Sequence, residues 1–430
     1  MTRSKTVDRV PWEDVLTPRG LVGDVARWIR ESSTMAQPKF ALAGALTVCG
    51  SLLGRGVMDW TGQRTNIYTL AVGNTSAGKN DPIRCIQKLL LALDREILLC
   101  GEVTSDTALE CLLLTFSSRL LLIDEVGHYV TSIKGAGSSN GHLRTVMPML
   151  TKAWSAAGGA LQGKARAPDT NGKLRPPRTI QEPNVAFYGT SAPDVLFDGM
   201  SEGDFGDGSI PRFVPFLSSD RPKADFKSNI EVPNELKESL EAALATFGLV
   251  REIYKQDDEK IPRLAFGKPI LFKRREDSER VFLELENEKH EHLTQADLGD
   301  APLYLWGKAV ENARRVALTV AALSHPGARE IQLKDAVYAV RLIQLTIDEM
   351  VERVREDVAT TKAERDKRVI LRALRGGATV TRSDLTRRTQ GLSKHDREDA
   401  LDDLIEAGRV VEVDGPGTGS KAVTYFRRTF

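Results

Sequence analysis

The sequence predicts an α/β fold in which a parallel β-sheet is flanked by helices, followed by a small C-terminal domain. Between residues 66 and 220, short apolar runs alternate with helical stretches, which is typical of a parallel sheet covered on both faces. The apolar content of 41% over 430 residues is enough to fill the cores of two or three domains. The predicted strands are IYTLAV (67–72), EILLCG (96–101), RLLLIDE (119–125) and NVAFYGTS (184–191).

The pattern of apolar and charged residues divides the chain into four regions. The first is helical, because GLVGDVARWIRESS and the apolar run at 40–54 both have helical character. The third is charged and mostly helical, with a long connection near 255–270 and two apolar-periodic helices at 305–323 and 333–354. The regions are 1–62 (helical), 63–222 (sheet core), 223–358 (helical lid and connecting region) and 359–430 (C-terminal domain, beginning with a charge-rich linker or helix at 360–368).

Composition excludes several classes of protein. The 60 basic and 59 acidic residues balance, so a basic surface for nucleic acid must be local. The four cysteines show no C-x-x-C spacing and indicate buried thiols in a reducing compartment. The longest apolar run, at 40–54, is too short to span a membrane, and the N-terminus lacks a signal-peptide core. We therefore expect a cytoplasmic protein with no membrane partner.

Residues 69–84, TLAVGNTSAGKNDPIR, nearly match the phosphate-binding pattern G-x-x-x-x-G-K-[ST]. The glycines and Lys79 have the required spacing, between a predicted strand and a helix start, but Asn80 replaces the usual Ser or Thr. Backbone N–H groups of such a loop wrap a β-phosphate, and its lysine reaches the β- and γ-phosphate oxygens. GGALQGK (158–164) has the same glycine–lysine spacing but follows no strand. The predicted nucleotide-binding residues are Gly73, Asn74, Thr75, Ser76, Ala77, Gly78, Lys79, Asn80 and Asp81.

A second motif follows 45 residues after Lys79, where an apolar strand ends in Asp124-Glu125. A carboxylate in this position can hold a magnesium ion, and the adjacent glutamate can polarise an attacking water. The alternative is that both residues merely end a strand. An asparagine carbonyl can also bind Mg²⁺, so Asn80 and Asp124 are the predicted metal ligands. Asn80 leaves three outcomes open: altered metal geometry with activity, nucleotide binding without turnover, or a vestigial site.

Five further positions are candidates for contact with the nucleotide. Thr190 and Ser191 end a predicted strand and can orient water, unless they only mark a strand-to-turn transition. Arg212 stands alone in GDGSIPRFVPF, like an arginine presented to a neighbouring subunit's phosphate, although a structural role is the alternative. One of Arg314 and Arg315 can reach the nucleotide from the lid. The alternative, a position on a solvated helix face, should hold for at least one of the two.

GNTSAGKN, LLLIDEVG, NVAFYGTSAP, GSIPRF and ENARRVALTVAAL occur in the same order as in phage- and plasmid-encoded P-loop ATPases associated with primase–helicase proteins. The chain resembles this family over roughly residues 20–350, and the family is similar to superfamily 3 and AAA+ helicases, which form hexameric rings around DNA. The resemblance implies a P-loop ATPase core with ATP and Mg²⁺ as cofactors, in a bacterial host cell. It implies Lys79 as the loop lysine, Asp124 as the magnesium acid, Glu125 as the catalytic acid, Thr190 or Ser191 as the water sensor, and Arg212 as the arginine finger. No zinc-ribbon cysteines accompany these motifs, so we do not expect primase activity within the chain.

Two regions are candidates for DNA contact. Residues 162–183 surround the turn signal Asp169–Gly172, and a basic hairpin there resembles the pore hairpin of superfamily 3 helicases; a solvated surface loop is the alternative. The last sixty residues predict a winged helix, with Thr381 and Ser393 as helix caps and 415–420 as the wing. Its acidic second helix leaves duplex DNA binding and protein docking both open. The candidate DNA-binding residues are Lys164, Arg166, Lys173, Arg175, Arg178, Arg387, Arg388, Lys394, Arg397 and Lys421.

The sequence thus predicts an ATP-dependent DNA helicase or translocase that acts in the replication of a phage or other mobile element. The expected partners are single-stranded DNA in the pore of a homo-hexamer, duplex DNA at the winged helix, and a primase or another replication protein. The first alternative is a DNA-binding regulator that binds nucleotide but hydrolyses it weakly or not at all. A small-molecule kinase is a third interpretation, disfavoured by the Asp-Glu pair and the winged helix.

Overall fold

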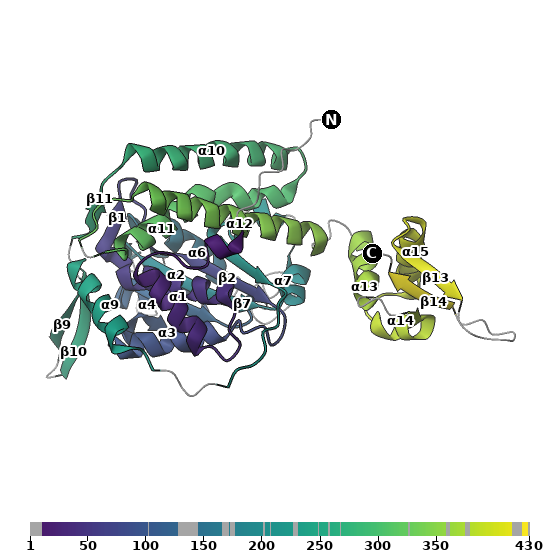
Figure 1. The fold of residues 1–430 in the computed structure, drawn as a ribbon, viewed down its shortest axis with the longest axis horizontal. Coiled ribbons are helices and arrows are strands. Elements are labelled where there is room, and N and C mark those ends of the chain that lie inside the picture. The colour runs from purple at the N-terminus through teal and green to yellow at the C-terminus, as the bar shows by residue number, and fades with distance from the viewer. Residues whose placement is uncertain are drawn as a thin grey trace. The chain divides into compact units, whose positions relative to one another are not determined.

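The computed structural model describes most of the chain as two compact units, Met1–Glu352 and Arg353–Phe430 (Figure 1). The two units are described separately below. The described residues are 11–101, 103–127, 145–165, 172, 177–200, 203–206, 208–226, 231–247, 249–256, 259–266, 268–325, 327–357, 362–374, 379–414 and 424–428.

The core of the first unit is a sheet that has five strands within the described residues. Its order is β3-β4-β7-β2-β8, and every neighbouring pair is parallel. The α/β class and the mostly parallel sheet are therefore confirmed, and the arrangement is compatible with a P-loop-like fold. The strands are β2 (Tyr68–Gly73), β3 (Leu99–Cys100), β4 (Ser118–Ile123), β7 (Asn184–Ser191) and β8 (Phe213–Ser218).

Three of the four predicted strands form nearly as expected, and two details differ. The run EILLCG begins as a 3-10 turn, Glu96–Leu98, so that only the two-residue β3 pairs with the sheet. Strand β8 was not predicted, because Pro215 interrupts its apolar run and proline lacks the N–H that a ladder requires. The structure accommodates Pro215 because β8 lies at an edge of the sheet.

Helices cover both faces of the sheet. Adjacent residues of a strand point to opposite faces, and the Tyr68 hydroxyl donates to the Leu150 carbonyl at 3.0 Å while the Thr69 hydroxyl lies 2.7 Å from that of Thr47. Leu150 belongs to one helix and Thr47 to another, so these two helices pack on opposite sides. They are α6 (Val146–Ser155) and α2 (Pro38–Leu53), and α2 is joined by α1 (Leu21–Ser32) and α3 (Asp81–Ala92).

The helices predicted in residues 1–62 are confirmed as α1 and α2. Helix α2 is buried from Phe40 to Leu53, which explains its continuous apolar sequence. Between α3 and α6, α4 (Asp106–Thr115) follows β3, with its first turn capped by Ser105, whose hydroxyl accepts from Ala108 N–H at 3.1 Å.

The prediction of a long connection near 255–270 is wrong. Strands β9 (Leu249–Gln256) and β10 (Glu259–Phe266) pair there as an antiparallel hairpin. The β-branched and aromatic residues of VREIYKQ and KIPRLAF favour strands, but neither segment alternates strictly, and the high charge of the surrounding sequence suggested a loop. The hairpin lies between helix α9 (Asn234–Thr246) and strand β11 (Ile270–Phe272) in sequence. Strand β11 pairs in parallel with β1 (Val57–Asp59), and helix α10 (Glu276–Asp297) follows it.

The two apolar-periodic helices predicted after residue 300 are present. A 3-10 segment, Ala301–Lys308, leads into α11 (Ala309–Ala322), and α12 (Leu333–Asp357) follows. Nearly every residue of α11 is buried, and the helix packs against α2, α10 and β1. Helix α11 is thus a core helix of the first unit, which differs from the expected lid.

The second unit contains a helix-turn-helix beside a three-stranded sheet of order β12-β14-β13. Thr381 and Ser393 cap the two helices as predicted, accepting from Asp384 N–H and Asp396 N–H at 3.1 Å each. Ile370, Leu385, Leu401 and neighbours form its apolar core, and the predicted wing at 415–420 lies outside the described residues. Its elements are α13 (Lys362–Ala373), β12 (Val380–Thr381), α14 (Arg382–Arg388), α15 (Lys394–Glu406), β13 (Val410–Asp414) and β14 (Thr424–Arg428).

No helix in the part of the chain that the structure describes combines the length and the apolar character needed to cross a membrane.

Candidate functional site

The candidate site lies where three neighbouring strands end. Strand β7 separates β2 from β4, and all three run parallel, so their carboxyl ends meet at one edge of the sheet. Strand β2 leads into the glycine loop, β4 into Asp124 and Glu125, and β7 ends in Thr190 and Ser191. The sheet order therefore brings together three motifs that are spread over more than a hundred residues of the sequence.

The loop between β2 and α3 has a backbone that requires glycine at one position. Gly78 has a φ of +80°, and a Cβ there would lie 2.2 Å from the Met35 carbonyl oxygen. Met35 is held in place because its N–H donates to the Asp81 carboxylate at 2.8 Å. Asp81, which we predicted to bind nucleotide, thus fixes the segment between α1 and α2 against the loop.

Lys79 is buried at the end of this loop, with 8% of its surface exposed. Its Nζ lies 2.8 Å from Glu125 Oε1. The Tyr188 hydroxyl donates to the Lys79 carbonyl at 2.9 Å, and burial raises the pKa of Tyr188, which keeps this donor protonated. Tyr188 was not predicted as a site residue, although a buried tyrosine one residue before Gly189-Thr190 needs an acceptor for its hydroxyl.

Asp124 accepts two hydrogen bonds, one at each carboxylate oxygen. The Thr190 hydroxyl donates to Oδ1 at 2.5 Å, and the Asn80 side-chain N–H donates to Oδ2 at 2.8 Å. The three residues come from β4, β7 and the start of α3, so the predicted metal ligands Asn80 and Asp124 are indeed neighbours.

Glu125 is held in a strained conformation. Its φ is +56°, in the left-handed region that residues other than glycine rarely adopt. Its N–H points to the Thr190 hydroxyl at 3.4 Å, and its Oε2 accepts from Ala192 N–H at 3.3 Å. Backbone strain of this kind persists only where the surroundings impose it, and it is enriched at functional sites.

The donor set fits a magnesium ion. Asn80, Asp124 and Thr190 offer a carboxamide, a carboxylate and a hydroxyl, all of them hard oxygen ligands of the kind Mg²⁺ prefers. No group of three or more His, Cys, Asp or Glu side chains suited to a metal occurs in the described residues. A metal bound here would therefore complete its coordination with water or phosphate oxygens, which is usual for Mg²⁺.

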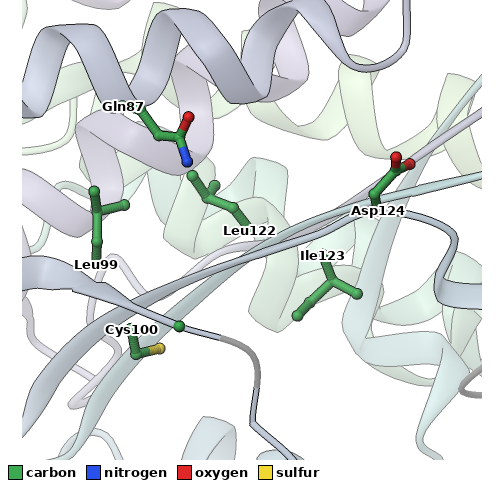
Figure 2. A pocket seen from close by; sticks show the side chains of 7 residues that line it. Gln87, Leu99, Cys100, Leu122, Ile123 and Asp124 are labelled. Carbon is green, nitrogen blue, oxygen red and sulfur yellow. The ribbon is translucent and has the colours of Figure 1, made fainter.

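A pocket of about 460 Å³ opens beside Asp124 (Figure 2). Strands β3 and β7 flank β4 on opposite sides, so the pocket on the β3 side lies across Asp124 from Thr190. Burial raises the pKa of Cys100 in its wall to about 11, which argues against a reactive thiolate. The other lining residues are Gln87, Leu99, Gly101, Leu122 and Ile123.

Arg212 lies away from this edge. It directly precedes β8, whose first residue pairs with Tyr68 at the start of β2, so Arg212 lies at the amino end of the strands. Its guanidinium donates to the Gly208 carbonyl and to the Ser155 hydroxyl, and it lies over the Trp154 ring at 5.3 Å. Within one chain, Arg212 and Lys79 are at opposite ends of the sheet.

The structure does not bring Arg314 or Arg315 to the nucleotide loop, and neither lies on a solvated face. Arg314 donates to Glu279 at 2.7 Å and lies over the Phe282 ring at 4.5 Å. Both are buried, so the expected solvated alternative is wrong for each.

Arg315 donates to the side-chain and backbone oxygens of Asn66 and to the Trp154 carbonyl, and it lies over the Trp154 ring at 3.7 Å. Burial lowers the pKa of Arg315 to about 9. The burial of nearly all of α11 imposes these structural roles, which helical periodicity alone does not reveal.

The two strands at the base of the predicted basic hairpin are present. β5 (Ala160–Gln162) and β6 (Thr179–Gln181) pair in antiparallel register, so the strands lie further out in sequence than the predicted KARAP and KLRPP. β5 begins inside GGALQGK, which confirms that this second glycine motif is no phosphate loop. Lys164 pairs with Asp106, and Arg178 is exposed. Arg166, Lys173 and Arg175 lie outside the described residues.

In the second unit, most candidate DNA-binding cations bond within the unit itself. Arg397 donates to Thr389 Oγ1 at 2.8 Å and to the Leu392 carbonyl at 2.9 Å, which braces the turn between α14 and α15. Arg388 donates to the Ala373 carbonyl at 2.9 Å, and Arg387 pairs with Asp384 at 2.5 Å. Lys394 is exposed, whereas Lys421 lies outside the described residues.

No known family model matches the chain, and no curated protein matches it.

Proposed function

We propose that this protein is an ATPase and that its substrate site is the edge formed by the ends of β2, β4 and β7. The observation that supports this most directly is the convergence of Lys79, Asp124, Glu125 and Thr190 from three separate strands. A loop with Gly78 in the left-handed region, followed by the start of α3, presents backbone N–H groups suited to phosphate oxygens.

The arrangement suggests how each residue contributes to hydrolysis. Lys79 exchanges its contact with Glu125 for the β- and γ-phosphate oxygens, and Glu125 is then available to accept a proton from the attacking water. Thr190, fixed between Asp124 and the Glu125 N–H, orients that water. Asn80 and Asp124 would hold the magnesium ion, which supplies positive charge to the phosphate oxygens.

The position of Arg212 is compatible with an assembly in which sites lie between subunits. Because Arg212 and Lys79 lie at opposite ends of the parallel strands, Arg212 would have to act on a neighbour's nucleotide. We therefore propose a ring, a hexamer by the resemblance noted above, in which Arg212 completes the adjacent site.

For the biological role we propose a DNA helicase or translocase in the replication of a phage or other mobile element. The β5–β6 hairpin, with Lys164 and Arg178 at its base, is the proposed contact for single-stranded DNA. The C-terminal unit is the proposed winged helix, with Lys394 at the exposed start of α15 as its candidate phosphate contact.

The direct test is steady-state ATPase activity of the wild type and Lys79→Ala, each with and without single-stranded DNA. We expect activity only in the wild type, raised by DNA. Equal rates in all four samples would overturn the proposal.

A nucleotide-binding regulator without turnover is the second candidate. The observation that favours it is that Asn80 replaces a hydroxyl and bonds directly to Asp124. Tight ATP binding by the wild type without phosphate release, with or without DNA, would select this candidate over the ATPase.

A further inference from the structure

Helix α4 presents two buried carboxylates to the base of the β5–β6 hairpin. Asp106 and Glu110 are four residues apart and therefore lie on one face of the helix, with 7% and 3% of their surfaces exposed. The Lys164 ammonium group pairs with Asp106, and the Lys164 N–H donates to Glu110 Oε2 at 3.5 Å. Both the side chain and the backbone of Lys164 are thus held by α4.

Gly163 permits this close approach of the hairpin to α4. A Cβ on Gly163 would lie 2.4 Å from Glu110 Oε1, and the Gly163 N–H donates to the Arg178 carbonyl on the other side of the hairpin at 2.8 Å. Gly163 and Lys164 end the motif GGALQGK, which forms no phosphate loop. In the folded chain this glycine–lysine pair instead fits the acidic face of α4.

The ion pair between Lys164 and Asp106 can open without a large penalty. The Lys164 side chain remains 53% exposed, so an anion from the solvent can reach its ammonium group. Asp106 also accepts from the Thr107 N–H and the Thr145 side chain, and it lies in the first turn of α4, where the helix dipole favours a carboxylate. When Lys164 leaves, Asp106 therefore does not become an isolated buried charge.

We propose that the Asp106–Lys164 pair is an autoinhibitory contact, which holds Lys164 against α4 until a phosphate of single-stranded DNA displaces Asp106. The proposal rests on the DNA contact proposed for the hairpin and deepens it, because it names the group that competes with the phosphate. Arg178, at the other side of the hairpin base, is exposed and can contact the strand while the pair is closed. Lys164 then adds its charge only after the exchange.

The test is the affinity for a fluorescently labelled oligothymidine, measured by anisotropy with the full-length wild type and Asp106→Asn. The asparagine keeps the shape of the side chain and an oxygen for the Thr107 N–H, but it no longer neutralises Lys164. We expect Asp106→Asn to bind about two- to fivefold more tightly, the range for losing a competing, partly exposed ion pair. If the pair only supported the hairpin, the same variant would bind DNA more weakly.

Two backgrounds separate the ion pair from the general effect of removing a negative charge. The gain from Asp106→Asn should disappear in Lys164→Ala and persist in Arg178→Ala, because only Lys164 is released by the substitution. An equal gain in both backgrounds would overturn the proposal. Asp106 is buried, so thermal unfolding checks each variant, and Asp106→Ser, a second neutral side chain suited to the start of a helix, should give the same gain.

The outcomes also distinguish this proposal from the proposed function. If the wild type binds the oligothymidine and folded Asp106→Asn and Asp106→Ser bind it equally or more weakly, the autoinhibitory contact is wrong while the hairpin remains the proposed DNA contact. If neither the wild type nor Asp106→Asn binds it, the DNA contact itself fails, and the autoinhibitory contact with it.

Discussion

At the scale of single residues, the candidate site combines one ion pair with two hydrogen bonds to a carboxylate. Lys79 and Glu125 form an ion pair at 2.8 Å, and Asp124 accepts from Asn80 and Thr190. In the proposed ATPase, a nucleotide phosphate would compete with Glu125 for Lys79, and this exchange would release the glutamate for proton transfer. The proposal therefore couples nucleotide binding and activation of the base through one contact, the Lys79–Glu125 ion pair.

Glu125→Gln tests this coupling. The variant cannot accept a proton, so turnover should fall by about 10²–10⁴-fold, the usual contribution of a positioned general base. ATP affinity should stay the same or rise, because a neutral amide competes less for Lys79. Phosphate release and ATP-analogue binding are the two measurements, and a fall in affinity parallel to turnover would contradict the assigned role.

At the scale of elements, the loop and the segment before α2 pack against each other. Gly78 contacts Met35, and Met35 is fixed by Asp81 at the start of α3. The segment between α1 and α2 and the start of α3 therefore define the loop shape together.

Gly78→Ala should disrupt the loop. The left-handed φ disfavours alanine by about 1–2 kcal/mol, and the added Cβ would lie 2.2 Å from the Met35 carbonyl. We expect ATP-analogue affinity to fall about tenfold or more by the same free-energy scale. Gly159→Ala is the matched control, since a Cβ there meets no atom within 4 Å and it belongs to the second glycine motif. Equal affinities for both variants would refute this account of the loop.

The same elements show what the sequence can and cannot predict. Strands β2, β4 and β7 and the caps Thr381 and Ser393 follow from local patterns, because continuous apolar runs and cap residues are short-range signals. The hairpin β9–β10 and edge strand β8 were missed, since charge and Pro215 masked their pattern.

Side-chain partners are less predictable, because tertiary packing determines them. An arginine in an apolar helix or beside a turn suggests a ligand-binding residue. The guanidinium groups of Arg314, Arg315 and Arg397 instead donate to Glu279, Asn66 and Thr389 of the α14–α15 turn. Only the packing of α11 and the second unit reveals this. Conversely, the convergence of Lys79, Asp124 and Thr190 was predictable from motif order alone.

At the scale of the whole molecule, one chain does not place Arg212 beside its own loop. The proposed ring therefore makes each site depend on two subunits, with Lys79 from one and Arg212 from the other. An arginine acting in this way contributes about 10³–10⁵-fold to turnover.

A mixing experiment tests this dependence. Arg212→Ala and Lys79→Ala should each be inactive alone, whereas an equimolar mixture should recover part of the ATPase activity because some interfaces contain both native residues. Analytical ultracentrifugation with an ATP analogue checks that each variant assembles. Assembled variants whose mixture stays inactive would exclude a shared site.

The central claim is that the edge formed by β2, β4 and β7 binds ATP through Lys79. Equilibrium binding of a non-hydrolysable ATP analogue with Mg²⁺, compared among the wild type, Lys79→Ala and Lys88→Ala, tests it most directly. Lys88 lies on the same helix α3 and pairs with the exposed Glu231 at 3.4 Å, so it controls for loss of a lysine near the loop. We predict that Lys88→Ala binds like the wild type and that Lys79→Ala binds about 10- to 100-fold more weakly, the range for a hydrogen bond to a charged group. Equal binding by all three proteins, or no binding by the wild type, would contradict the account.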